Sequence, residues 1–320
     1  MNEGKSRARL VSRAIGAFVL ILATSVAAAG AGAATNAAAA VPVSDTTRSG
    51  AVDSTLDRAL DSLSGLSGKL RFKLISEPRS LEIGAVARLF GRAKASTPGV
   101  HSLATEDSAP GFSLVTLLPF RTKTPAGKIG SYRMGFWPAE KSATRSPAYA
   151  NPAGFIEVTR ENQDTYVSEH FRLRDFLTKD QQNVWPKYLV LREELIDKLE
   201  LVITDLSKRG VTVKHMTVMS GFRTPQYNQK GVGSGGRASS SRHQYGDAAD
   251  VFVDNDRNGR MDDLNRDGRV DHRDAQVILD AADRVERAHP VLLGGGGLYR
   301  ATAAHGPFAH IDVRGNRARW

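Results

Sequence analysis

Two histidines and an aspartate are the candidate metal ligands of this chain. His243 precedes Asp250 by seven residues, with glycine and small residues between them, and the apolar run 251–253 follows the aspartate. Such a run is typical of a short buried strand, so both side chains should reach one wall of a site. His310 lies sixty residues beyond Asp250, in a second strand-like segment. Imidazole and carboxylate are ordinary zinc ligands, and a hydrolytic zinc takes three protein ligands plus an open position for water.

Four motifs occur in order around these residues: His170-Phe171-Arg172-Leu173-Arg174-Asp175-Phe176, Ser220-Gly221-Phe222-Arg223-Thr224-Pro225, Ser241-Arg242-His243 through Gly246 to Asp250, and Ala309-His310-Ile311-Asp312. Together they resemble the zinc D-alanyl-D-alanine carboxypeptidase family of peptidoglycan hydrolases, whose metal site is shared by hedgehog and the lysostaphin-type peptidases. The resemblance covers about residues 165–320. It implies that His243, Asp250 and His310 bind one zinc ion, which would bring the pKa of its bound water toward ~7 and polarise the scissile carbonyl.

The resemblance also suggests a catalytic role for Arg223. In the family the matching arginine faces the substrate, and a guanidinium suits either a developing oxyanion or a peptide carboxylate. A surface salt bridge is the alternative role for this side chain.

The general base is where this chain departs from the family. Relatives carry a histidine or an acidic residue just before the last ligand, whereas here those positions hold Phe308 and Pro307. His305, on a turn five residues before His310, and Asp312, on the same side of the strand as His310, are the remaining candidates. Asp312 could instead orient the histidine, and either residue could be structural.

An acidic insertion, residues 254–274, separates the second and third ligands and resembles the tandem calcium loops of dockerins or thrombospondin type-3 repeats. One loop would use Asp263, Asn265, Asp267, the Arg269 carbonyl, Asp271 and Asp274, with Gly268 at the turn. An earlier register would use Asp254, Asp256, Asn258, the Arg260 carbonyl, Asp262 and Asn265. The earlier register ends in an amide and shares Asn265, so it should bind calcium more weakly. A solvated charged loop is the alternative.

The elements expected to position these groups give an α+β fold. Residues 161–320 should form the zinc-peptidase domain, a small antiparallel sheet with flanking helices. A helix is expected over 189–206, followed by a strand that ends at Ser220. Residues 96–160 are predicted to form a small β-rich accessory domain, and residues 41–95 are predicted to form a linker and helical segment. The aromatic residues Tyr132, Phe136 and Trp137 could stack on sugars, although packing in the core is their more frequent use.

Composition and the first forty residues bear on location and partners. Residues 1–40 have the basic start, apolar core and small-residue cleavage zone of a secretory signal, which predicts export to the periplasm or cell envelope. No other stretch could cross a membrane, so no stable span is expected after processing. The net charge of +10 favours anionic partners such as wall polymers, and nothing resembles a nucleic-acid-binding module. The absence of cysteine excludes disulfides and thiolate metal sites.

These features predict an exported, zinc-dependent hydrolase of peptidoglycan stem peptides with a calcium-stabilised insertion. Carboxypeptidase and cross-link endopeptidase activity both fit the sequence. The alternatives are a catalytically silent wall-binding module that carries zinc and calcium, and a calcium-dependent adhesion or scaffold protein.

Overall fold

The computed structural model describes residues 60–76, 86, 89–103, 111–142, 146–233 and 236–320, all within one compact unit that spans residues 46–320. The expected signal sequence and residues 41–59 lie outside the described residues. The fold is α+β, as predicted. No helix in the described part of the chain is long and apolar enough to cross a bilayer.

A five-stranded sheet carries the site, with strand order β13-β11-β12-β10-β9. All pairings are antiparallel except that of β11 with β13. All six residues of the interior strand β10 are buried, which explains its nearly continuous apolar sequence. The strands are β9 (Met216–Ser220), β10 (Ala248–Val253), β11 (Gly295–Tyr299), β12 (Phe308–Asp312) and β13 (Ala318–Arg319).

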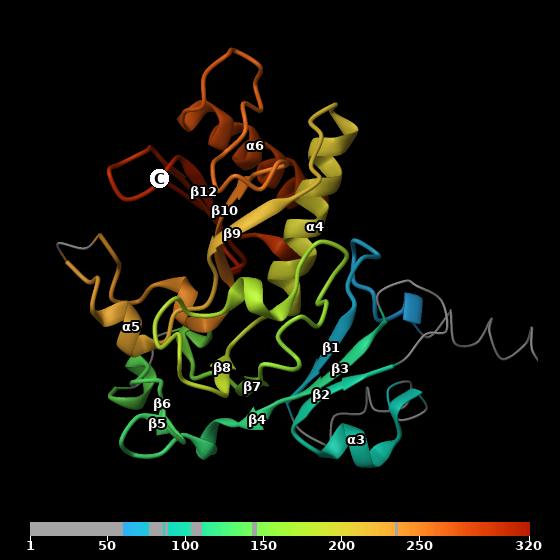
Figure 1. The fold of residues 1–320 in the computed structure, drawn as a ribbon, viewed down its shortest axis with the longest axis vertical. Coiled ribbons are helices and arrows are strands. Elements are labelled where there is room, and N and C mark those ends of the chain that lie inside the picture. Colours follow the sequence, from blue (N-terminus) through green and yellow to red (C-terminus); the bar gives the residue numbers. More distant parts are fainter. Residues whose placement is uncertain (1–59, 77–85, 87–88, 104–110, 143–145, 234–235) are drawn as a thin grey trace, which may run out of the picture. The chain divides into compact units, whose positions relative to one another are not determined.

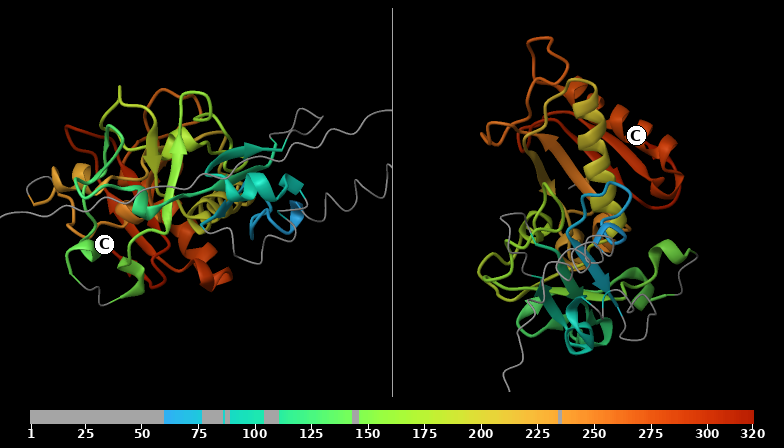
Figure 2. Two further views of the ribbon diagram at one scale, coloured as in Figure 1. Left: turned by 90° about the horizontal axis from the view of Figure 1, so that it is seen from below. Right: turned by 90° about the vertical axis from the view of Figure 1, so that its right-hand side faces the viewer.

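Two long helices, α4 (Glu193–Lys208) and α6 (His272–Ala288), pack against each other, and α6 also packs on β11 and β12. Figures 1 and 2 show α4, in yellow, beside this sheet. The buried ammonium of Lys198 on α4 donates to Glu286 on α6 at 2.7 Å and to the Asp312 carbonyl of β12 at 2.8 Å, which ties the three elements together. Helix α4 begins at Glu193 rather than at the predicted residue 189, because residues 187–189 form a strand.

That strand, β8, pairs with β7, which lies in the segment expected to form an accessory domain. Tyr132, Trp137 and Phe155 from this segment belong to the same hydrophobic core as Leu195 of α4 and Val251 of β10. Residues 115–142 and 146–158 therefore share their core with the elements that carry the predicted metal ligands, whereas Phe112 and Leu114 belong to a second, smaller cluster.

The remaining elements are short. The helices are α3 (Arg92–Ser96) and α5 (Pro225–Gln229), and the 3₁₀ helices are η1 (Phe120–Thr122), η2 (Pro138–Glu140), η3 (Pro147–Tyr149), η4 (Leu173–Phe176), η5 (Arg242–Tyr245) and η6 (Pro290–Leu292). Among the described residues, three smaller sheets contain β1 (Phe72–Ile75), β2 (Gly99–Ser102) and β3 (Ser113–Thr116); β4 (Leu118–Pro119), β7 (Gly154–Val158) and β8 (Lys187–Leu189); and β5 (Lys128–Ile129) with β6 (Tyr132–Arg133).

Candidate metal centre

The backbone brings the three predicted zinc ligands to one place. Asp250 and His310 are direct partners in the antiparallel ladder of β10 and β12, so their side chains leave the same face of the sheet. His243 comes from η5, and Gly246 turns the chain from η5 into β10 with a left-handed φ of 68°. A Cβ at Gly246 would lie 2.3 Å from the Val190 carbonyl oxygen, so only glycine fits this turn.

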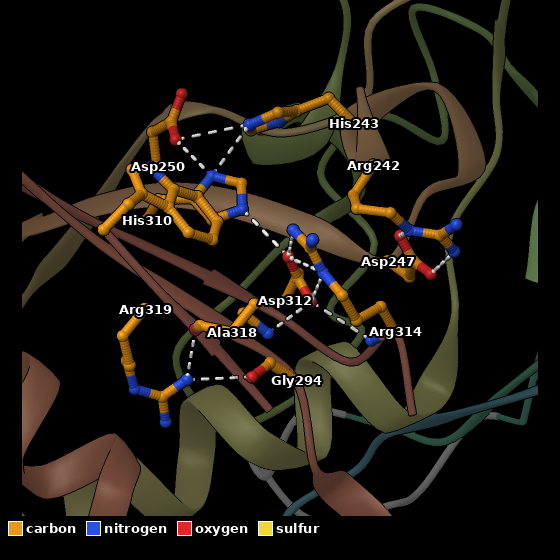
Figure 3. A network of polar contacts seen from close by, with 12 residues as sticks. Arg242, His243, Asp247, Asp250, Gly294, His310, Asp312, Arg314, Ala318 and Arg319 are labelled. Atoms are coloured by element: carbon orange, nitrogen blue, oxygen red, sulfur yellow. Dashed lines mark hydrogen bonds and ion pairs between the residues drawn. The ribbon is translucent and has the colours of Figure 1, made fainter. Parts of the chain in front are cut away.

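The ligand atoms of these residues form a small triangle (Figure 3). Asp250 Oδ1 lies 3.2 Å from His243 Nε2 and 2.9 Å from His310 Nδ1, and the two nitrogens are 3.2 Å apart. Ligand atoms held 2.0–2.1 Å from a tetrahedral zinc lie ~3.3 Å from one another. The triangle therefore has the size of one face of a zinc tetrahedron, and all three side chains are buried. This group could hold a metal ion.

Outer hydrogen bonds fix which ring nitrogens face the triangle. His243 Nδ1 donates to the Gly221 carbonyl at 2.7 Å, and His310 Nε2 donates to the Asp312 carboxylate at 3.1 Å. Because these oxygens can only accept, the lone pairs of the opposite nitrogens point toward Asp250. Three converging acceptor atoms require a cation among them, either a metal ion or a proton.

The pKa shifts of the three side chains are consistent with a cation bound among them. Burial lowers the pKa of His243, which favours its neutral, ligating form. Burial alone would raise the pKa of Asp250, but the two histidines hold it well below its ordinary value. Burial opposes a charged His310, yet its contacts with Asp250 and Asp312 raise its pKa. A proton on His310 therefore competes with the metal, and metal binding must displace it.

Asp312 is an orienting group for His310. It is fully buried and accepts hydrogen bonds from the Gly295 amide at 2.6 Å and from Arg314, through both its amide and its guanidinium. Burial raises the pKa of Asp312, but contacts with His310 and Arg314 outweigh this and place it far below the ordinary value. Such a carboxylate is a poor proton acceptor. Of the two roles that the sequence leaves open, the geometry favours the orienting one.

The other two catalytic candidates lie in different settings. Arg223 donates from Nη2 to Asp250 Oδ2 at 2.5 Å and from Nε to Ser220 at 2.8 Å, so it borders the ligand group directly. Two of its five N–H donors are used in these contacts within the described part of the chain. His305 is not brought to the ligands: its Nδ1 contacts the Gly306 carbonyl at 2.8 Å on an exposed turn.

Several residues that support the ligand group were not predicted from the sequence. Gly221 accepts a hydrogen bond from His243, and Gly295 and Arg314 donate to Asp312, through contacts that form only in the folded chain. Arg242 lies over the rings of Tyr149 and Tyr245, which contact each other, and its buried ion pair with Asp247 holds η5 in place. Gly221 and Arg242 lie within two of the motifs around the predicted ligands, whereas Gly295 and Arg314 carry no signal in the sequence.

The acidic insertion forms two loops with the same hydrogen bonds nine residues apart. The Asp254 carboxylate accepts from the amides four and five residues ahead, and Asp263 does the same. Gly259 and Gly268 have φ values of 81° and 82° at equivalent turn positions. The insertion is thus a tandem structural repeat.

The acidic side chains of the earlier register converge. One carboxylate oxygen from each of Asp254, Asp256 and Asp262 lies within 4.8 Å of the other two, an arrangement that could hold a cation. In the later register, which we expected to bind more strongly, Asp271 and Asp274 cap α6 in a reciprocal capping box. Asp267 lies 3.2 Å from Arg273.

Comparison of this chain with family models, curated proteins and solved structures finds no match, so the interpretation of the centre rests on its own geometry.

Proposed function

We propose that this protein is a zinc-dependent hydrolase of peptidoglycan peptides, which cleaves an amide bond next to a D-amino acid. The observation that supports it most strongly is the triangle of His243, Asp250 and His310, in which every ligand is oriented by a further hydrogen bond. Catalytic zinc sites keep three protein ligands and one open position, and ligating histidines donate their second nitrogen to a carboxylate or carbonyl. The choice of peptidoglycan as substrate rests on the motif resemblance and on the expected export.

The residues of this chain have separable tasks in such a reaction. A bound zinc ion would supply an acidified water and polarise the scissile carbonyl. Asp312 holds His310 in the ligating tautomer, and Arg223 holds Asp250. The remaining N–H groups of Arg223 can donate to a substrate oxygen, either the carbonyl as charge develops on it or a terminal carboxylate.

Digestion of purified muropeptides tests this function. The zinc-loaded protein should release D-alanine or separate cross-linked stem peptides, as resolved by mass spectrometry. A chelator should abolish cleavage, and added zinc should restore it. Retention of full activity after the metal has been removed, as verified by elemental analysis, would rule out the proposal.

A catalytically silent metal-binding wall protein is the second candidate. It is favoured by the surroundings of the ligands: among the described residues, the only titratable side chains hydrogen-bonded to the triangle are Arg223 and Asp312. Neither is a suitable general base. The digestion experiment separates the two candidates, because the silent protein would bind one equivalent of zinc and sediment with cell walls but cleave no muropeptide.

We also infer that the insertion binds calcium and stabilises the fold. The crowded carboxylates of Asp254, Asp256 and Asp262 repel one another until a divalent cation neutralises them. Asp254 follows β10 directly, and its amide donates to the His215 carbonyl at 3.0 Å. Its neighbour Asn255 accepts from the Lys214 amide. An ordered loop therefore secures the ends of both β9 and β10.

Calcium is expected to raise the melting temperature. A ligand at 100 times its Kd stabilises the native state by ~2.7 kcal/mol, which corresponds to roughly 5–10 °C for a chain of this size. Asp256→Ala and Asp267→Ala should each reduce this shift while leaving the zinc content unchanged. Differential scanning calorimetry in calcium and in a calcium-selective chelator measures it.

Asp280→Ala is the matched control, since Asp280 is an exposed carboxylate on α6 that accepts a hydrogen bond from Gln276 at 2.8 Å and lies outside the insertion. Its calcium response should equal that of the unaltered protein. Identical melting curves with and without calcium would leave the insertion as a solvated charged loop.

A further inference from the structure

Phe136 is an aromatic residue that the core does not use. Its side chain is 43% exposed, whereas the nearby Tyr132 and Trp137 are fully buried. The two buried aromatics confirm core packing as their role, but exposure of a phenylalanine next to such a core has no packing benefit. Gly135, with a left-handed φ of 80°, turns the chain so that Phe136 faces outward.

The exposed ring lines a cavity of ≈ 420 Å³ between the segment after β6 and helix α5. The cavity combines one aromatic wall with amide and ammonium groups, and its polar side chains are Lys141, Gln226, Gln229 and Lys230. Small-molecule sites have this composition: an apolar surface that supplies contact area and a few polar groups that fix orientation.

The walls of this cavity are held in place. The backbone amide of Gln226 donates to the Met134 carbonyl at 3.0 Å, and a Cβ at Gly135 would lie 2.6 Å from the backbone nitrogen of Gln226. Lys123 Nζ, itself paired with Glu140 at 2.6 Å, lies 4.5 Å from the centre of the Phe136 ring. Because the Lys123 side chain is buried beneath one face of the ring, a ligand would have to contact the other face.

Two structural links join the walls of the cavity to residues beside the candidate metal centre. Helix α5 begins two residues after Arg223, and Figure 1 shows it next to β5 and β6. The Trp137 indole N–H donates to the Gln244 carbonyl at 2.8 Å, directly beside the ligand His243. A polymer bound with its peptide at the metal could therefore place another part of itself at Phe136.

We propose that the Phe136 cavity binds an N-acetylated amino sugar of the glycan strand that carries the cleaved peptide. This inference rests on the proposed function for the identity of the polymer. The C–H face of a pyranose packs against an aromatic ring, and its acetamido group and hydroxyls match the donors and acceptors of Gln226 and Gln229. The ammonium groups of Lys141 and Lys230 donate to the remaining sugar oxygens.

The test is binding of chitotetraose, a tetramer of N-acetylglucosamine, to the full-length zinc-loaded protein, measured by isothermal titration calorimetry. The unaltered protein should bind it saturably, and Phe136→Ala should weaken binding at least ~10-fold, as expected for a central aromatic contact. Phe136→Trp should retain binding. Cellotetraose, which lacks the acetamido groups, should bind more weakly than chitotetraose.

Leu66→Ala is the control variant, because it removes an apolar side chain that is 52% exposed in another part of the chain. It should bind chitotetraose as the unaltered protein does. Equal binding by the Phe136→Ala variant, or no saturable binding by the unaltered protein, would refute the inference. Cleavage of a soluble stem peptide without glycan is measured separately: sugar binding without cleavage contradicts only the proposed function, and cleavage without sugar binding contradicts only this site.

Discussion

A His243→Ala variant is expected to purify without zinc and to show no detectable cleavage of muropeptides, while remaining folded. The substitution removes one of three buried ligand atoms, which leaves only Asp250 and His310 to hold the ion, and Asp250 is also paired with Arg223. The fold should survive, because β10 and β12 are joined by their own backbone ladder and pack on an extensive apolar core. Elemental analysis gives the zinc content, and circular dichroism gives the fold.

His289→Ala provides the matched histidine control, since His289 lies at the end of α6 outside the ligand group. It should retain one equivalent of zinc. A full equivalent of zinc in the His243→Ala protein would show that the ligands are wrongly assigned.

An Arg223→Ala variant is expected to lose ~10²–10³ in turnover at saturating zinc, the usual effect of removing one electrostatic stabiliser of a transition state. Arg223→Lys should also be impaired, because an ammonium cannot contact Asp250, Ser220 and a substrate oxygen with one planar fork. Since Arg223 also orients Asp250, both variants should bind zinc about 10–100-fold more weakly. Steady-state kinetics over a range of zinc concentrations separate the two effects.

Arg209→Ala is the corresponding control, because Arg209 pairs with Asp205 at 3.5 Å at the exposed end of α4. Its turnover should be unchanged. If Arg223→Ala turned over normally but melted at a much lower temperature, Arg223 would be a structural residue only.

The sequence predicts those features that depend on short-range pattern. The α+β class, the approach of His243 to Asp250 and the tandem acidic loops all follow from spacing within a few residues. His310 is also where the motif resemblance expects it, and the ladder of β10 and β12 explains why. Helix α4 is predicted in type but not at its start, because β8 forms by pairing with the distant strand β7.

Features that depend on long-range packing are not predictable in this way. The pattern of residues 96–160 indicates strands, but nothing local shows that Trp137 donates to Gln244 or that Phe155 shares a core with β10. The orienting role of Asp312 likewise depends on Gly295, which a separate strand brings near. The expectation that the later register binds calcium more strongly depends on ligand chemistry alone. It does not include the capping role of Asp271 at α6, which only the folded chain shows.

The nine-residue offset between the two acidic loops determines which insertions and deletions the segment between β10 and α6 can accept. Residues 254–262 and 263–271 are equivalent units, so Asp262 occupies in the first the place that Asp271 occupies in the second. Removal of residues 263–271 would join Asp262 directly to His272, with Asp262 at the start of α6 and Asp274 three residues beyond it. That single loop would have an acidic residue at its twelfth position, where the first loop now has Asn265. Insertions and deletions in steps of nine therefore preserve the connection between β10 and α6, whereas other step lengths displace the helix cap.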